Sequence, residues 1–271
     1  GIAGCGKSMT AKAMSALWQL PLLRLDVGRI FSGYIGSSEE NMRKAVQTAE
    51  AVAPSILWID EIEKGFGGNG GERDGGTTTR VFRTFLTWMQ EETKPVFVIA
   101  TANKINQLPP EMLRKGRFDE IFFVDLPTVN ERKIIFELHL EKRLKGSISK
   151  EFKVTDEPLT KLSDATEGFG GSEIEQVVVS ALFEAFSENR QLQEDDLFRV
   201  IKNTIPLSTT QAEQILAIRE WANERAVAAT AHDEQYNYVP EETEEIVIKK
   251  EKAKKNTETV KRARGGRTID F

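Results

Sequence analysis

Glycines, a lysine and a hydroxyl side chain stand together in the stretch GIAGCGKS, residues 1–8. Gly1, Gly4 and Gly6 leave room for backbone N–H groups to converge on phosphate oxygens, and a helix that begins directly afterwards adds positive potential at its N-terminus. Lys7 can place an ammonium on β- and γ-phosphates, and the Ser8 hydroxyl can ligate Mg²⁺. The alternative is a glycine-rich turn before a helix, but the spacing favours a phosphate-binding loop.

Two carboxylates follow an apolar run of strand length in the stretch ILWIDE, residues 56–61. Ligands bind at the carboxyl ends of strands in open α/β sheets. At such an end Asp60 can hold Mg²⁺ through water, and Glu61 can polarise a water that attacks a γ-phosphate. An apolar run that ends in Asp-Glu is common by itself. After a phosphate-binding loop it points to nucleotide hydrolysis.

Polar residues also follow the next apolar run, residues 95–100. Asn103 could orient the attacking water, or it could simply cap a turn. Arg114 and Arg117 lie on either side of Gly116 in the stretch LRKGRFD, which could be a solvated surface turn. The sharper interpretation is an arginine finger, which places a guanidinium on the charge that develops at the γ-phosphate.

The elements that would position these residues alternate between helix and strand over the first 125 residues. Apolar positions at a helical period predict a helix over residues 7–19, and Ser37 with Glu40 forms a capping box for a second one that Pro54 ends. Uniformly apolar runs suit strands that are covered on both faces, as in a parallel sheet. We expect a short strand at residues 22–26 and such covered strands at residues 55–59, 95–100 and 121–124. The first domain, residues 1–127, is therefore predicted to be α/β.

Only helical patterns follow Pro127. Helices are predicted to begin at Thr128 with Glu131, at Ser172 with Glu175, and near Asp195. They would form a helical domain over residues 128–205, followed by one C-terminal helix over residues 206–230. A glycine-rich segment at residues 65–76 is expected to be a mobile loop.

Charge and composition exclude several classes of protein. Lys and Arg number 37 against 42 Asp and Glu, for a net charge of -5, which argues against a dedicated nucleic-acid binder. No apolar run approaches the ~18 residues of a membrane span. Residues 231–271 are acidic and then strongly basic, so a solvated disordered tail is favoured over a site for an anionic partner.

The chain has one cysteine, Cys5, which excludes an internal disulfide and fits a reducing compartment. A helix N-terminus and Lys7 can lower the pKa of a thiol, so oxidation of Cys5 could block phosphate binding. The alternative, that Cys5 is a small residue at a variable position, is favoured.

Taken in order, the phosphate-binding loop, the LWIDE strand, ATAN and LRKGRFD resemble the AAA clade of AAA+ ATPases over about residues 1–205. Shorter stretches such as LLRLDVGR and RVFRTFLTW resemble a group of these ATPases from cyanobacteria and algal plastids. The resemblance implies a P-loop NTPase parallel sheet followed by a small all-helical lid. It also implies ATP and Mg²⁺ as ligands, and either a bacterial cytoplasm or a plastid stroma as the location.

The resemblance further implies a homo-oligomeric ring, usually a hexamer, in which Arg114 and Arg117 reach the nucleotide of a neighbouring subunit. His139 matches a histidine near the adenosine, although it could be a surface helix histidine. Gly171 and Ser172 match the lid motif, but Ser172 stands where alanine is usual. The implied nucleotide-binding set is Gly1, Gly4, Cys5, Gly6, Lys7, Ser8, Met9, His139, Gly171 and Ser172.

Tyr34 and Ile35 lie on a short glycine-flanked segment where AAA rings place an aromatic pore loop. An exposed Tyr34 could grip an extended polypeptide, whereas the plainer alternative packs it under the following helix. Three functions stay open: a motor that remodels a protein partner, a nucleotide-gated scaffold with slow turnover, and a nucleic-acid remodelling ATPase. In this family a strand precedes the loop in the middle of the sheet, so we expect the 271 residues alone to fold poorly.

Overall fold

The computed structural model describes residues 1–31, 37–66, 77–91, 94–114, 116–145, 149 and 152–230. The chain divides into a compact unit, Gly1–Tyr236, and a second unit, Asn237–Phe271, which lies entirely outside the described residues. Tyr34 and Ile35 of the predicted pore loop, most of the predicted loop at 65–76 and the predicted tail at 231–271 also lie outside them.

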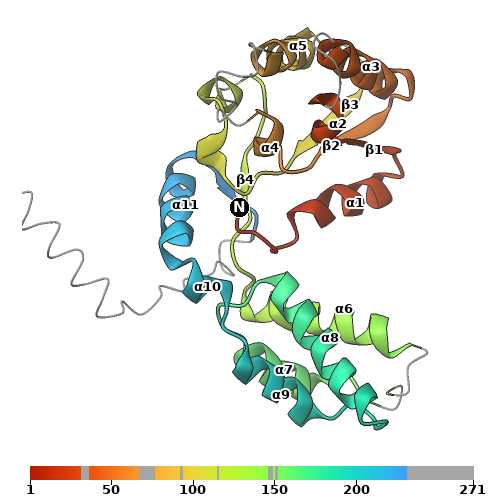
Figure 1. The fold of residues 1–271 in the computed structure, drawn as a ribbon, viewed down its shortest axis with the longest axis vertical. Coiled ribbons are helices and arrows are strands. Elements are labelled where there is room, and N and C mark those ends of the chain that lie inside the picture. The colour runs from red at the N-terminus through yellow and green to blue at the C-terminus, as the bar shows by residue number, and fades with distance from the viewer. Residues whose placement is uncertain are drawn as a thin grey trace, which may run out of the picture. The chain divides into compact units, whose positions relative to one another are not determined.

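A three-stranded parallel sheet forms the centre of the first half of the described chain (Figure 1). Its strands are β1 (Leu22–Leu25), β2 (Ser55–Ile59) and β3 (Val96–Ala100), in the order β1-β2-β3. Every residue of the middle strand β2 is buried, as its uniformly apolar sequence predicts. The prediction of a parallel α/β sheet is confirmed.

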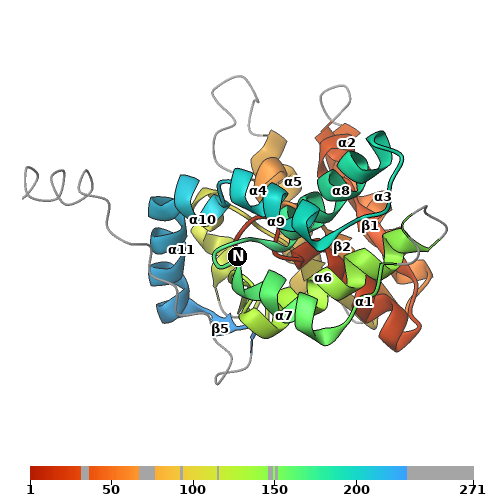
Figure 2. The ribbon, with the colours of Figure 1, turned by 90° about the horizontal axis from the view of Figure 1, so that it is seen from below.

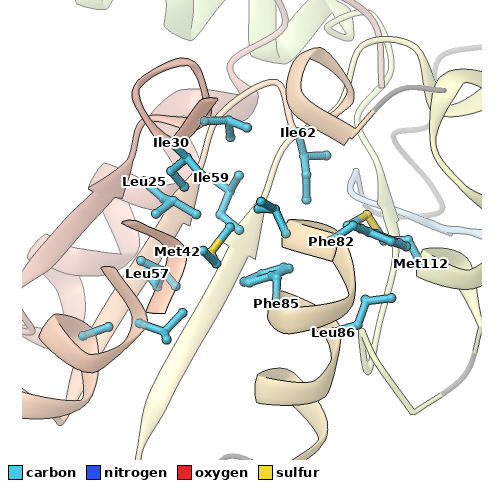
Figure 3. Close-up of a cluster of buried hydrophobic side chains, with 14 of the residues drawn as sticks. Leu25, Ile30, Met42, Leu57, Ile59, Ile62, Phe82, Phe85, Leu86 and Met112 are labelled. Atoms are coloured by element: carbon cyan, nitrogen blue, oxygen red, sulfur yellow. The ribbon is translucent and has the colours of Figure 1, made fainter. Parts of the chain in front are cut away.

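Two long helices cover one face of this sheet. They are α3 (Ser37–Ala51) and α5 (Thr77–Glu91), and their apolar side chains pack on Leu57 and Ile59 of β2 (Figure 3). Met42 and Phe85 at the centre of the cluster are fully buried. Shorter elements lie around it: α2 (Val27–Phe31), α4 (Glu63–Phe66) and the 3-10 turns η2 (Ile105–Gln107) and η3 (Pro110–Leu113).

The helix α1 (Lys7–Trp18) covers the other face. Successive side chains of a strand point to opposite faces, so Trp58 of β2 points away from α3 and α5. The Lys12 ammonium of α1 lies over the Trp58 ring, 5.8 Å from its centroid. The predicted helix over residues 7–19 is confirmed to within one residue, because Gln19 takes a left-handed conformation that ends it.

A strand does form within the predicted run 121–124, but it does not join this sheet as the pattern of a single parallel sheet suggests. A cavity of about 490 Å³ lies between β3 and this segment, with Val98, Ala100 and Phe122 among its lining residues. The two-residue strand β4 (Phe122–Phe123) instead pairs in parallel with β5 (Val227–Ala228), more than a hundred residues later in the chain.

Four helices with a core of their own follow: α6 (Val129–Leu144), α7 (Asp156–Asp164), α8 (Gly171–Ser187) and α9 (Glu194–Asn203). Phe136, Leu162, Ile174 and Leu197 are among the buried side chains of this core.

The start of α6 is confirmed, with the Thr128–Glu131 capping box. The caps predicted at Ser172 with Glu175 and at Asp195 are each two residues late, because the helices are capped at Gly170 and Gln193. Glu173 closes the box on the Gly170 N–H, and Asp196 closes the other on the Gln193 N–H.

The predicted single helix over residues 206–230 is two helices and a strand. The short α10 (Leu207–Thr210) is followed by α11 (Ala212–Arg225), and in Figure 2 β5 leaves the end of α11. Ile215 of α11 packs with Ile2 and Leu126 in a small third cluster. Among the described residues, no helix combines the length and apolar character that crossing a membrane requires.

Candidate functional site

The loop at residues 1–6 depends on glycine at two positions. Gly4 has φ 73° and Gly6 has φ 89°, in the left-handed region that side chains with a Cβ rarely adopt. A Cβ on Gly4 would also lie only 2.1 Å from Ser172 Oγ. The α1 helix begins at the next residue, Lys7. The backbone of the loop therefore leads directly into a helix N-terminus, which is the arrangement that binds phosphate in many proteins.

The Lys7 side chain turns back over this loop. Its Nζ donates to the Gly1 carbonyl at 3.0 Å and also to the Ile2 carbonyl. Burial lowers the pKa of Lys7, although nearby acidic groups oppose this effect. A partly desolvated ammonium whose acceptors are neutral carbonyls would gain from an anionic partner.

The loop and the end of β2 meet through Ser8 and Asp60. Ser8 Oγ donates to Asp60 Oδ1 at 2.8 Å, and Thr101 Oγ1 donates to the same oxygen at 2.7 Å. A hydroxyl and a carboxylate are oxygen ligands of the kind that Mg²⁺ takes, and Mg²⁺ usually keeps waters and binds through only one or two carboxylates. Within the described part of the chain, no group of three His, Cys, Asp or Glu side chains could hold a metal. The residues present fit a magnesium ion that shares its ligands with a nucleotide.

The second carboxylate, Glu61, lies against Asn103 at the end of β3. Asn103 Nδ2 donates to Glu61 Oε1 at 3.1 Å, and Lys64 Nζ donates to Glu61 Oε2. Glu61 also has φ 50°, a strained value for a residue with a side chain. Strain of this kind is tolerated where the surroundings fix the residue, and here the Thr101 hydroxyl accepts from the Glu61 N–H at 3.1 Å.

The N-terminus of α8 closes on the same loop. Ser172 N–H donates to the Gly4 carbonyl at 2.9 Å, and a Cβ on Gly171 would lie 3.2 Å from that carbonyl oxygen. The structure therefore brings together most of the sequence-predicted residues: Gly1, Gly4, Cys5, Gly6, Lys7, Ser8, Asp60, Glu61, Asn103, Gly171 and Ser172.

The Cys5 thiol lies inside this contact, and burial raises its pKa to about 11 in spite of the nearby Lys7. Because the reactive form of cysteine is the thiolate, we expect Cys5 to be unreactive. From a pKa of 9.0 to about 11, the thiolate fraction at pH 7.5 falls by about 100-fold. Alkylation of the Cys5 peptide by iodoacetamide, followed by mass spectrometry, should be slower by this order in the folded protein than in urea. Equal rates, or loss of nucleotide binding in mild peroxide, would restore the thiol-switch alternative.

His139 is held by the lid helices. Arg143 NH1 lies 3.0 Å from His139 Nδ1, and Glu175 Oε1 lies 3.7 Å from it. Burial lowers the pKa of His139 more than Glu175 raises it, so the ring is neutral at pH 7. Neutral imidazole can accept from Arg143 at Nδ1 and leaves Nε2 as a donor.

Four predicted residues, His139 among them, are not drawn into this cluster by any contact within the described segments. Arg117 donates to the Glu111 carbonyl, Arg114 is exposed, and Met9 is 58% exposed. Tyr34 and Ile35 lie outside the described residues.

Four residues that sequence reasoning missed also belong to the site. They contact its carboxylates or the backbone around them and are Arg24, Glu63, Lys64 and Thr101. Thr101 and Glu63 lie within the stretches ATAN and DEIE, so their proximity to the motif was a usable signal. The sequence around Arg24 gave no such signal, because the ion pair of Arg24 with Asp60, at 3.6 Å, depends on the pairing of β1 with β2.

Comparisons with known proteins find a matching family and several relatives of this chain. Residues 1–126 match the family described as ATPase family associated with various cellular activities (AAA). The chain is 47% identical over 223 residues to an uncharacterized AAA domain-containing protein ycf46 of Trieres chinensis, covering 82% of this chain and 44% of the relative. It is 49% identical over 224 residues to the ycf46 protein of Pyropia yezoensis, covering 83% and 44%. The chain thus spans less than half the length of these relatives.

Among solved structures, the FIGL-1 AAA domain in complex with ADP has a TM-score of 0.69 and 18% sequence identity. The match covers 83% of this chain and 76% of that one, and it shows that the two share a P-loop AAA+ α/β fold. By the match over residues 1–126 and by its relatives, the chain carries a domain of the AAA family.

Proposed function

We propose that this protein binds ATP with Mg²⁺ and hydrolyses it to drive conformational work on a protein partner. One observation carries the proposal: the phosphate-binding loop touches the end of β2 through Ser8 and Asp60, at 2.8 Å. A loop suited to phosphates and a carboxylate suited to a metal therefore serve one ligand. The FIGL-1 neighbour was solved in complex with ADP, which supports a nucleotide as the ligand.

Each residue has a role that its position allows. Lys7 leaves its loop carbonyls to bind the β- and γ-phosphates, and Ser8 and Asp60 hold the metal. Mg²⁺, when bound there, neutralises charge on the phosphate oxygens. Glu61 accepts the proton of the attacking water, and Asn103, 3.1 Å away, holds that carboxylate and orients the water.

The remaining nucleotide contacts would come from the lid and from a neighbouring subunit. Gly171 and Ser172 close on the loop, Met9 lies in the first turn of α1, and the Nε2 of His139 could donate to the adenosine. Arg114 and Arg117 are free to act on the next subunit of a ring because neither is committed to this subunit's own carboxylates in the described contacts. We propose a homo-oligomer, a hexamer by family resemblance, in which these arginines complete each site.

The domain division that we propose has an α/β domain at 1–127, a helical lid at 128–205, a C-terminal segment at 206–230 and a tail at 231–271. The separate cores of the sheet and of α6–α9 support the first boundary. The algal ycf46 relatives favour the plastid stroma over a bacterial cytoplasm as the location.

The remodelling motor and the slow scaffold are separated by Tyr34→Ala in the intact protein. For the motor, wild type and Tyr34→Ala should both release phosphate from ATP with Mg²⁺ and neither should with EDTA. An unfolded test polypeptide such as fluorescein-labelled casein should then speed phosphate release by the wild type only, because Tyr34 is proposed to grip that polypeptide. Equal stimulation of both proteins, or none of either, would favour the scaffold.

Binding to DNA or RNA that depends on the tail and falls steeply with salt would favour nucleic-acid remodelling.

A further inference from the structure

Glu63 is a buried carboxylate of the candidate site that makes no hydrogen bond to the loop at residues 1–8 or to Asp60 in the described contacts. Its exposure is 5%, and its Oε1 accepts from the Asn103 N–H at 3.0 Å. The other oxygen, Oε2, is buried without a hydrogen-bond partner. Acidic side chains are almost never buried unless a partner compensates, so a carboxylate kept at this position calls for a reason.

The contact that Glu63 makes is one of several that join the end of β2 to the end of β3. Ile62 N–H donates to the Thr101 carbonyl at 2.9 Å, and Glu61 N–H donates to the Thr101 hydroxyl at 3.1 Å. The Glu63 carboxylate continues this series to Asn103. The hydrogen bond from the Asn103 N–H to Glu63 lies just before the chain continues through Lys104 into η2.

The same asparagine holds the proposed base. Asn103 is fixed through its backbone N–H by Glu63, and its side-chain Nδ2 then donates to Glu61 Oε1 at 3.1 Å. Without the tie to Glu63, nothing in the described contacts of the Asn103 backbone would hold its amide at that distance. A displacement of about 1 Å at a reacting centre can cost on the order of 100-fold in rate.

We propose that Glu63 is a positioning residue for ATP hydrolysis, which fixes Asn103 so that the Asn103 amide orients Glu61 and the attacking water. This inference rests on the proposed function. It assigns Glu63 its effect on the chemical step and not on the grip of the nucleotide, because Glu63 makes no hydrogen bond or ion pair with Lys7, Ser8 or Asp60 in the described contacts. The charge of Glu63 does act on Lys7 and raises its pKa, so a variant that keeps this charge tests the positioning role alone.

Two variants separate the reach of the Glu63 side chain from its charge. Glu63→Asp keeps the charge but is one methylene too short to reach the Asn103 N–H. Glu63→Gln loses the charge but keeps a carbonyl oxygen at the right reach. Glu157→Asp, on the exposed surface of α7, is the matched control for shortening a glutamate.

In the intact protein, with phosphate release measured against ATP concentration, Glu63→Asp should lower kcat on the order of 10-fold with KM nearly unchanged. Glu63→Gln should rescue most of that loss, and Glu157→Asp should match the wild type. In an Asn103→Ala background, Glu63→Asp should cause no further loss, because the side-chain amide that the contact positions is gone.

A Glu63→Asp protein with wild-type kcat would overturn the proposal, as would a Glu63→Gln protein as impaired as Glu63→Asp. A double variant whose loss of kcat is the product of the separate Glu63→Asp and Asn103→Ala losses would overturn the proposal as well. These results all leave wild-type hydrolysis intact. A wild type that releases no phosphate would overturn the proposed function itself, and this inference with it.

Discussion

Lys7→Ala is expected to weaken ATP binding by at least about 100-fold and to abolish phosphate release. The Lys7 ammonium is the loop's own cation, and burial already lowers its pKa. In the structure its acceptors are two neutral carbonyls of the loop. Hydrogen bonds between charged partners contribute roughly 1.5–3 kcal/mol each, so losing contacts to two phosphates costs ~3 kcal/mol or more.

Isothermal titration with ATP and Mg²⁺ measures this loss. Lys12→Ala is the matched control, because it removes a lysine from the same helix whose ammonium lies over the Trp58 ring instead of the loop. Lys12→Ala should bind ATP as the wild type does. Equal affinity of wild type and Lys7→Ala would remove the loop from the site.

Glu61→Gln should retain ATP binding and lose turnover by on the order of 10²- to 10⁴-fold, the range that general-base catalysis supplies. The amide keeps the size of the side chain and can still accept from Asn103 at Oε1. It cannot take a proton from water, so the loss should appear in kcat with KM for ATP little changed.

The control for this charge removal is Glu40→Gln, on the exposed face of α3, where Glu40 pairs with Lys44. It should leave both constants unchanged. A Glu61→Gln protein that turns over at the wild-type rate would mean that another group activates the water. Loss of ATP binding in the same variant would instead place Glu61 among the ligands that hold the nucleotide.

Local patterns predicted the loop and the strands that carry the site. The glycines at 4 and 6 impose a backbone that few other residues adopt, and the apolar run before Asp60 can be buried only in a covered sheet. Each of these signals is complete within a few residues. The carboxylates and Asn103 follow two strands that lie side by side, so their meeting could be expected from a parallel sheet.

Pairings between distant segments could not be predicted from the sequence. The strand β5 has only two residues, too few to show the alternation of a strand, and it pairs with β4 because α11 ends beside it. The same holds for the contact of Ser172 with Gly4 and for the ion pair of Arg24 with Asp60. A single residue that acts through a long-range contact leaves no periodic trace.

The central claim is that one nucleotide with its magnesium is held jointly by the loop at residues 1–8 and by the acidic end of β2. The most direct test identifies the nucleotide that intact Glu61→Gln protein retains after incubation with ATP and Mg²⁺ and removal of free ligand. The predicted result is ATP on the Glu61→Gln protein and only ADP, or an empty site, on the wild type. Retention of ADP by Glu61→Gln, or no nucleotide on either protein, would contradict it.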